Sequence, residues 1–139
     1  MNVLDAVVAV VMRHRRVLVV KRAPTTRRPG FWTPISGAVE PGERQSAAVV
    51  REVAEEVGLS VAPLAKVWEC DTDDGTFRLH WWTATVTGGA LRLNPREVSE
   101  ARWILPDRFG DLHPTFADHR RFFAEILPTV ASPDPPGEG

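Results

Sequence analysis

The sequence predicts a single α/β domain whose mixed β-sheet carries helices on both faces. Several short stretches rich in β-branched residues have the pattern of strands, and two segments with helical periodicity are interspersed among them. A length of 139 residues suits one hydrophobic core. We therefore expect residues 1–128 to form the domain, and the Pro- and Gly-rich residues 129–139 to form a disordered tail.

The chain begins with two predicted strands and a basic loop. Residues 3–12 are rich in Val and Ala, residues 17–20 are a second β-branched run, and a short polar stretch separates them. Residues 21–30 follow as a basic segment punctuated by proline. This segment is either a solvated surface loop or a set of cations that binds a polyphosphate.

Residues 43–57 have the clearest helical pattern, and Gly58 stands where a helix would end. The spacing predicts that the core-facing side of this helix is formed by Val50, Val53 and Val57, with Ala47 and Ala54.

The second half of the chain predicts three more strands and a second helix. The strands are expected at residues 61–70, 76–86 and 101–105, and a weaker helix at residues 114–127. The first two strands are joined by Asp71-Thr72-Asp73-Asp74-Gly75, whose Asp-Gly step is a turn signal. The acidic residues of this turn are most simply read as a solvated hairpin tip.

Composition excludes several classes of function. A net charge of -1 gives no basic footprint for a nucleic-acid polymer, so none is expected as a partner. Cys70 is the only cysteine and is expected to be a small buried side chain, without a disulfide or thiolate metal site. The longest apolar run, residues 6–12, is too short to cross a bilayer. No membrane association and a cytoplasmic location are therefore expected.

Three glutamates form a stripe on the predicted helix of residues 43–57. Glu52, Glu55 and Glu56 have the spacing i, i+3 and i+4, which puts them opposite the valines. They are either a solvated face or a site for a cation. Like charges at these spacings cost a helix about 0.2–0.5 kcal/mol per pair, and the helix dipole disfavours them in the last turn. A divalent ion such as Mg²⁺, which takes oxygen ligands, would relieve both effects.

The segment from Gly37 to Leu59 resembles the Nudix box. That motif is Gly, five residues, Glu, seven residues, then Arg-Glu-apolar-x-Glu-Glu-x-Gly-apolar. The chain fills every specified position, including Glu43 and Arg51, over 23 residues. The chain is therefore identified as a member of the Nudix (MutT-like) hydrolase family. This resemblance implies the Nudix fold, an α/β/α sandwich with a mixed β-sheet.

The resemblance also implies a metal site. In the family the carboxylates of the box hold divalent ions, which carries over to Glu52, Glu55 and Glu56, with Glu52 and Glu56 as the principal ligands. Mg²⁺ is the expected ion and Mn²⁺ the alternative. Gly37 would offer its backbone carbonyl to a metal. Arg51 would orient the carboxylates, since it lies four residues before Glu55.

The family's reaction is attack of water on phosphorus, and it often uses a general base from outside the box. Glu97 is our candidate, because a glutamate six residues before Trp103 resembles the position of the base in some relatives. The alternatives are Glu100, Glu52 and Glu56, and Glu97 could equally be a plain polar loop residue.

Nucleotide contacts are expected near the basic loop. Phe31 and Trp32, beside that loop and the box, are the candidates for contact with the base. The candidates for contact with phosphates are Arg22, Arg27 and Arg28. Ile35 and Ser36 stand where many relatives have Pro and Gly, so the substrate of those relatives does not carry over.

The expected function is that of a metal-dependent pyrophosphohydrolase acting on a nucleoside diphosphate linked to a group X. Nucleoside triphosphates, oxidised ones included, are the first substrates to consider, with a nucleoside monophosphate and pyrophosphate as products. ADP-ribose and dinucleoside polyphosphates are alternatives. A Nudix module that senses a nucleotide without cutting it is the competing function, and an isomerase on the same fold is a third. A homodimer is one expected assembly, because dimers occur in the family.

Overall fold

The computed structural model describes residues 3–130. In this part of the chain seven strands form one sheet. The strands are β1 (Leu4–Arg13), β2 (Arg16–Arg22), β3 (Trp32–Thr33), β4 (Ile35–Ala38), β5 (Leu59–Asp71), β6 (Phe77–Gly89) and β7 (Val98–Ile104). The order is β3-β2-β1-β6-β5, while β4 also pairs with β1 and β7 with β2. β1 and β6 are parallel and the other pairs are antiparallel, which confirms the predicted mixed sheet.

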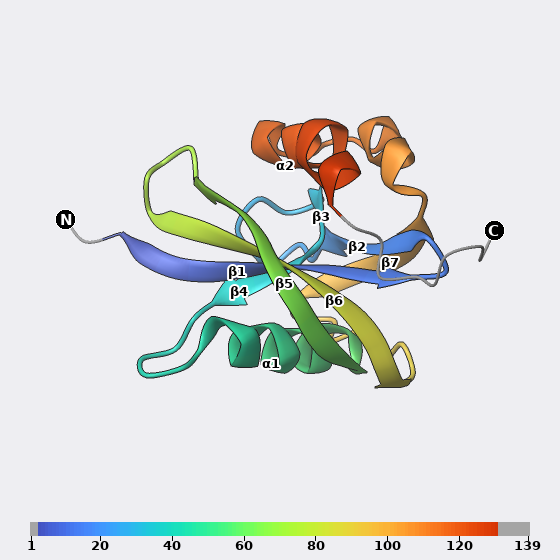
Figure 1. The fold of residues 1–139 in the computed structure, drawn as a ribbon, viewed down its shortest axis with the longest axis horizontal. Coiled ribbons are helices and arrows are strands. Elements are labelled where there is room, and N and C mark those ends of the chain that lie inside the picture. The colour runs from blue at the N-terminus through green and yellow to red at the C-terminus, as the bar shows by residue number, and fades with distance from the viewer. Residues whose placement is uncertain (1–2, 131–139) are drawn as a thin grey trace.

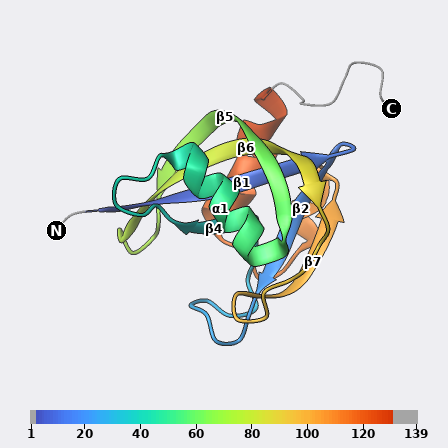
Figure 2. The same cartoon turned by 90° about the horizontal axis from the view of Figure 1, so that it is seen from below.

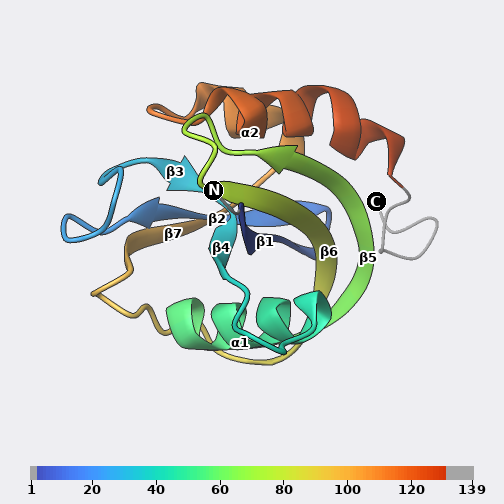
Figure 3. The same cartoon turned by 90° about the vertical axis from the view of Figure 1, so that its left-hand side faces the viewer.

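Helices cover both faces of the sheet. On one face lies α1 (Gln45–Val57), and on the other lie η1 (Pro106–Asp111), α2 (Ala117–Arg121), the π-helical η2 (Phe122–Ile126) and η3 (Leu127–Thr129). Figures 1 and 3 show the sheet between these two layers, and Figure 2 looks onto the face that α1 covers. The fold is thus an α/β/α sandwich. No helix within residues 3–130 is long and apolar enough to cross a membrane.

β1 accounts for both layers of the core because its side chains alternate between the two faces. Val7, Ala9 and Val11 pack under α1. Val8 and Val10 pack on the opposite side, in a cluster that includes the aromatic side chains Trp81, Phe109, Phe122 and Phe123. A central strand buried on both faces reads as a continuous apolar run, which is what residues 6–12 are.

The predicted core face of α1 is confirmed for Val53 and Val57 and wrong for its other three residues. Val50 is 37% exposed and Ala47 and Ala54 are exposed as well. The buried residues of the helix are Ala48, Val49, Val53, Glu56 and Val57. The prediction counted apolar residues alone, whereas the helix is turned so that Glu56 joins the side facing the sheet and reaches a pocket described below. The helix also begins two residues later than predicted, and it ends as predicted at Gly58, which adopts φ +76°.

Three further differences come from segments with little local pattern. β3, β4 and η1 were not predicted. For β3 and β4 the reason is that both strands are short and that residues 32–38 contain Pro34 and Gly37. The second helical segment begins at residue 117, three residues later than predicted, and continues to Thr129 through α2, η2 and η3. Thr129, which was assigned to the tail, therefore belongs to η3, and residues 131–139 lie outside the described residues.

Candidate active site

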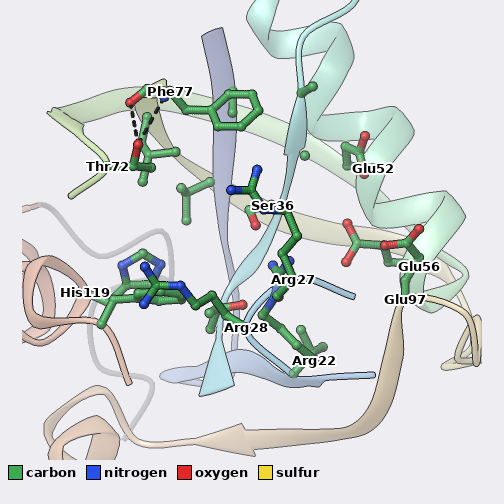
Figure 4. A pocket seen from close by; sticks show the side chains of 18 of the residues that line it. Arg22, Arg27, Arg28, Ser36, Glu52, Glu56, Thr72, Phe77, Glu97 and His119 are labelled. Atoms are coloured by element: carbon green, nitrogen blue, oxygen red, sulfur yellow. Dashed lines mark hydrogen bonds between the residues drawn. The ribbon is translucent and has the colours of Figure 1, made fainter. Parts of the chain in front are cut away.

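A pocket of about 720 Å³ opens between α1, the loop after β2, the β5–β6 hairpin and α2. Its volume lies in the range of small-molecule sites. In Figure 4 Glu52, Glu56 and Glu97 lie on one side, His119 and Phe77 on the other, and Arg22 and Arg27 between them. The pocket thus combines an acidic side, central cations and an aromatic side.

Glu52 and Glu56 form a hydrogen-bonded carboxyl pair on α1. Glu56 is only 6% exposed, and its burial raises its pKa to about 10, aided by the hydrogen bond and by the negative charges of Glu52 and Glu97. Burial also raises the pKa of Glu52, against the opposing hydrogen bonds from Glu56 and Arg51. The pair therefore holds a proton at neutral pH, with the Glu56 hydroxyl donating to Glu52.

The donor chemistry of this pair fits a hard divalent cation. Two adjacent carboxyl groups that retain a proton at neutral pH offer oxygen ligands to an ion able to replace that proton. Within residues 3–130, no three His, Cys, Asp or Glu side chains converge as a ready-made metal cage. Glu55 lines the pocket too, but it is turned toward Arg51 and its side chain is 57% exposed. The structure thus brings Glu52 and Glu56 together and leaves Glu55 at the rim.

Arg51 joins the helix to the loop before it. Its Nε and Nη2 donate to the two carboxylate oxygens of Glu43 at 2.8 and 2.9 Å, and its Nη1 donates to Glu52 at 2.7 Å. Nη2 also donates to the carbonyl of Ala38 at 2.9 Å, whereas the bond to Glu55 is longer, at 3.3 Å. These bonds raise the pKa of Arg51 and lower that of Glu43 to about 2. Arg51 therefore orients Glu52 more directly than Glu55, the partner that the spacing suggested.

Gly37 lies on β4, opposite Val7 of β1, and the Glu52 carboxylate fills the space beside it. A Cβ at position 37 would lie 2.1 Å from Cδ of Glu52. A side chain at this position would therefore force the Glu52 carboxylate to move. The expected role of its carbonyl as a metal ligand stays a prediction.

Glu97 is brought to the pocket by a turn that is bonded to two other elements. The amide of Asn94 donates to the carbonyl of Glu56 at 2.9 Å, and the amide of Ala23 donates to the carbonyl of Glu97 at 3.0 Å. Glu97 lines the pocket close enough for its charge to raise the pKa of Glu56. Glu100, the competing candidate, pairs with Arg102 at 3.4 Å and does not line the pocket.

The three arginines chosen from the sequence all line the pocket. Arg22, at the end of β2, donates from Nε to the carbonyl of Arg27 at 2.6 Å. Burial lowers the pKa of Arg22, against the opposing charges of Glu56 and Glu97. The structure thus places the half-buried Arg22 next to the glutamates, and it places Arg27 and Arg28, which are exposed, farther out.

The expected base contacts of Trp32 and Phe31 need correction. Trp32 is 5% exposed and packs in the core on the α2 side of the sheet, with the Arg102 guanidinium 4.6 Å from its ring centre. Side chains alternate along β3, so its neighbour Thr33 is the one that lines the pocket. Phe31 does not line the pocket and instead packs against Phe116 with the rings tilted by 35° and 4.6 Å between ring centres.

The aromatic side of the pocket was missed because its residues come from distant segments. Phe77 begins β6, Phe116 precedes α2 and His119 lies in α2. The His119 ring meets Trp81 edge-on at 4.8 Å, and its buried Nδ1 has no hydrogen-bond partner among residues 3–130. Burial lowers the pKa of His119 to about 3, so the imidazole is neutral. A histidine in the weaker predicted helix was the one signal available.

The acidic hairpin tip is an exposed turn, as predicted, and it also forms part of the pocket. Asp71, Thr72, Asp73 and Asp74 line the pocket, where they face the basic loop. The part of this turn in the pocket was not predicted, because nothing local in the sequence reveals which loop lies opposite.

Fold and site together define an α/β/α sandwich protein with a nucleotide-sized pocket that places a carboxylate-bearing helix opposite arginines. A family model described as NUDIX domain matches residues 2–126. The chain belongs to the Nudix family, as the motif implied.

Named relatives agree with this assignment. The chain is 35% identical over 102 residues to the NAD-capped RNA hydrolase NudC of Deinococcus radiodurans. The matched region covers 73% of the chain and 36% of that protein. It is 32% identical over 114 residues to a putative 8-oxo-dGTP diphosphatase 2 of Mycobacterium tuberculosis, covering 73% of the chain and 81% of the relative. It therefore spans about a third of the length of the NudC protein.

Solved structures share the fold. The MutT protein of Methanosarcina mazei Go1 superposes with a TM-score of 0.76 at 21% identity, over 88% of this chain and 91% of that one. A NUDIX hydrolase of Nitrosomonas europaea gives a TM-score of 0.77 at 19% identity, over 88% and 71%.

Proposed function

We propose that this chain is a divalent-metal-dependent hydrolase that cuts the phosphoanhydride bond of a nucleoside diphosphate linked to a group X. The observation that carries the proposal is the Glu52–Glu56 carboxyl pair beside arginines in a pocket of about 720 Å³. Metal-ligating oxygens and phosphate-binding cations are the two requirements of phosphoryl transfer, and they share one cavity here.

The metal would be held by Glu52 and Glu56, with Glu55 as a further ligand at the rim and Gly37 offering its carbonyl. Bound there, Mg²⁺ or Mn²⁺ would polarise a phosphoryl oxygen and lower the pKa of water. Arg51 keeps Glu52 in place through its 2.7 Å hydrogen bond. This arrangement requires the carboxyl pair to lose its proton when the ion binds.

The side chains of the pocket supply the remaining steps. Arg22, Arg27 and Arg28 bind phosphate oxygens. Glu97 accepts a proton from the attacking water while the water oxygen bonds to phosphorus and the bridging P–O bond breaks. That proton then passes to solvent or to the phosphate that leaves.

Nucleoside triphosphates, oxidised ones included, are the substrates that we propose first. One relative is named a putative 8-oxo-dGTP diphosphatase, and a 27% identical relative from Escherichia coli, covering 77% of the chain and 79% of that protein, is named CTP pyrophosphohydrolase. The aromatic side of the pocket offers Phe77 and Phe116 for contact with a base. ADP-ribose and dinucleoside polyphosphates are the next to test, followed by NAD-capped RNA, because the NudC relative is named for it.

The test is product release from a panel of these nucleotides with Mg²⁺, comparing the wild type with Glu56→Gln. We expect metal-dependent turnover that falls by at least about a hundredfold in the variant. Glu125→Gln is a matched control, because Glu125 is an exposed helical glutamate paired with Arg121 away from the pocket. Tight Mg²⁺-dependent binding without turnover on any nucleotide would instead identify a sensor module.

A further inference from the structure

Ion pairs between two loops bridge the pocket on its exposed side. Nη2 of Arg27 lies 3.5 Å from Oδ2 of Asp74, and Nη2 of Arg28 lies 3.2 Å from Oδ2 of Asp73. The arginines come from the loop between β2 and β3 and the aspartates from the tip of the β5–β6 hairpin. All four residues line the same pocket as the glutamates, and Figure 4 shows both arginines reaching into it.

The hairpin tip holds Asp74 in place. Oδ1 of Asp74 accepts hydrogen bonds from the Thr72 hydroxyl at 2.8 Å and from the Thr76 amide at 2.9 Å. The other oxygen of Asp74 is then directed at Arg27. The turn thus presents a fixed acceptor to the basic loop.

The basic loop is held by its own backbone. The Thr26 hydroxyl donates to the carbonyl of Ala23 at 2.7 Å, and Arg22 binds the carbonyl of Arg27. Arg28 has φ +56°, and its guanidinium lies 5.7 Å from the ring centre of Phe116. The two guanidinium groups therefore stand between the aromatic side of the pocket and the acidic tip.

These ion pairs form in the structure, but they are weak enough for another anion to replace the aspartates. The arginine side chains are 76% and 48% exposed, and exposed ion pairs contribute little to stability. A phosphate offers several charged oxygens to the same guanidinium groups, in a geometry that suits two parallel hydrogen bonds. A polyphosphate that reaches Arg27 and Arg28 can thus displace both aspartates.

We propose that Asp73 and Asp74 are specificity-determining residues that occupy Arg27 and Arg28 until a ligand supplies anionic oxygens to replace them. The proposal rests on the proposed function, because the ligand is a nucleotide polyphosphate. A ligand with few charged oxygens does not displace the aspartates, so the ion pairs stay in place across the pocket. A longer phosphate chain releases the arginines and binds them itself.

The test is the double variant Asp73→Asn/Asp74→Asn. Asparagine keeps the oxygen that accepts the turn hydrogen bonds and removes only the charge. On the nucleoside triphosphate that the wild type cleaves best, we expect KM to fall about three- to tenfold at low ionic strength, with kcat within about twofold. The difference in KM between the variant and the wild type should shrink as salt is added, because salt screens exposed ion pairs.

A double-mutant cycle separates competition from simple repulsion. In an Arg27→Gln/Arg28→Gln background the asparagine substitutions should leave KM unchanged, because no pair remains to be broken. An equal fall of KM in that background would overturn the proposal, and so would an unchanged KM in the wild-type background. Asp107→Asn/Asp111→Asn is the matched control, since Asp111 forms an exposed pair with Arg108 that does not line this pocket.

Calorimetry with inorganic tripolyphosphate and Mg²⁺ keeps the proposal testable without turnover. Asp73→Asn/Asp74→Asn should lower the Kd of tripolyphosphate in the wild-type background. The same substitutions should leave that Kd unchanged in the Arg27→Gln/Arg28→Gln background. A wild type that turns over no nucleotide would contradict the proposed function alone. An unchanged Kd for tripolyphosphate in the aspartate variant would contradict this inference alone.

Discussion

Two buried side chains in the pocket are held in forms that they would not have in water at neutral pH. Glu56 keeps its proton because burial and neighbouring carboxylates disfavour its charge, and His119 stays neutral because burial disfavours the imidazolium. Both residues face the same cavity from opposite layers of the sandwich. Burial of each residue imposes a cost on folding that depends on pH. The cost from His119 does not depend on metal binding.

His119 should make the protein less stable in mild acid. Its pKa is about 3 in the folded protein and ordinarily 6.5, so below pH 6.5 the unfolded chain takes up a proton that the folded chain does not. The free energy of unfolding should fall by up to about 1.4 kcal/mol per pH unit from this residue, or about 2 kcal/mol between pH 7 and 5. Urea unfolding of the wild type and His119→Gln at several pH values measures the difference.

The control for this effect is His14→Asn. His14 is exposed in the β1–β2 turn with φ +50°, a conformation that asparagine tolerates. This variant should follow the wild type at every pH. If the curves of His119→Gln and the wild type ran parallel, His119 would not be buried in its neutral form.

Gly37→Ala should weaken metal binding with little effect on folding. The added Cβ would lie 2.1 Å from Cδ of Glu52, so the flexible carboxylate must move. We expect the Mg²⁺ concentration for half-maximal activity to rise by about tenfold or more. Gly88→Ala is the matched control, because a Cβ there meets nothing within 4 Å. Equal Mg²⁺ dependence in the two variants would mean that Glu52 is not a ligand.

At the scale of elements, α1 carries the glutamates on which the proposed chemistry depends, and the segments around it fix its position. Arg51 binds the loop before the helix through Glu43 and Ala38, and Asn94 binds its last turn through the carbonyl of Glu56. The Trp82 indole on β6 donates to Gln45 at the start of the helix at 3.0 Å. Three contacts from three segments therefore determine where Glu52 and Glu56 point.

Arg51→Lys should lower activity although the charge is kept. Lysine cannot bind Glu43 through two parallel hydrogen bonds while also holding Glu52 and the carbonyl of Ala38. A fall in kcat of about 10- to 100-fold is expected from loosened carboxylates. Steady-state kinetics test this, with Arg108→Lys as the control in an exposed pair away from the site. Wild-type kcat in Arg51→Lys would show that one charge suffices.

At the scale of the whole molecule, the proposed metal site would link ion binding to stability. The folded chain assembles Glu52 and Glu56, and the unfolded chain does not, so an ion that binds them must stabilise the fold. An ion that took the place of the proton would also offset the cost of burying the pair.

Mg²⁺ should therefore raise the melting temperature of the wild type. At a concentration of about 100 times Kd the gain is about 2.7 kcal/mol, which amounts to several degrees for a domain of this size. Differential scanning calorimetry with Mg²⁺, and with NaCl at equal ionic strength, measures it. Glu52→Gln/Glu56→Gln should lose the Mg²⁺-specific shift, and the same shift in that variant would place the ion elsewhere.

Much of this protein follows from local sequence. Runs rich in β-branched and apolar residues predicted β1, β2, β5 and β6, and glycine at position 58 ended α1 as expected, because these patterns depend on neighbours in the chain. The spacing from Gly37 to Leu59 identified the family and selected Glu52 and Glu56, which the structure brings into contact. A motif within one loop and one helix is readable because its geometry is local.

Only the tertiary structure decided what faces the pocket. It turned α1 so that Glu56 is buried and Val50 exposed, placed Trp32 in the core, and supplied His119 and Phe77 in its place. It also set Asp73 and Asp74 against the basic loop, 45 or more residues away in the sequence. These outcomes depend on packing between segments far apart in the chain, where the burial of one side chain depends on which element covers it, and no local pattern encodes that choice.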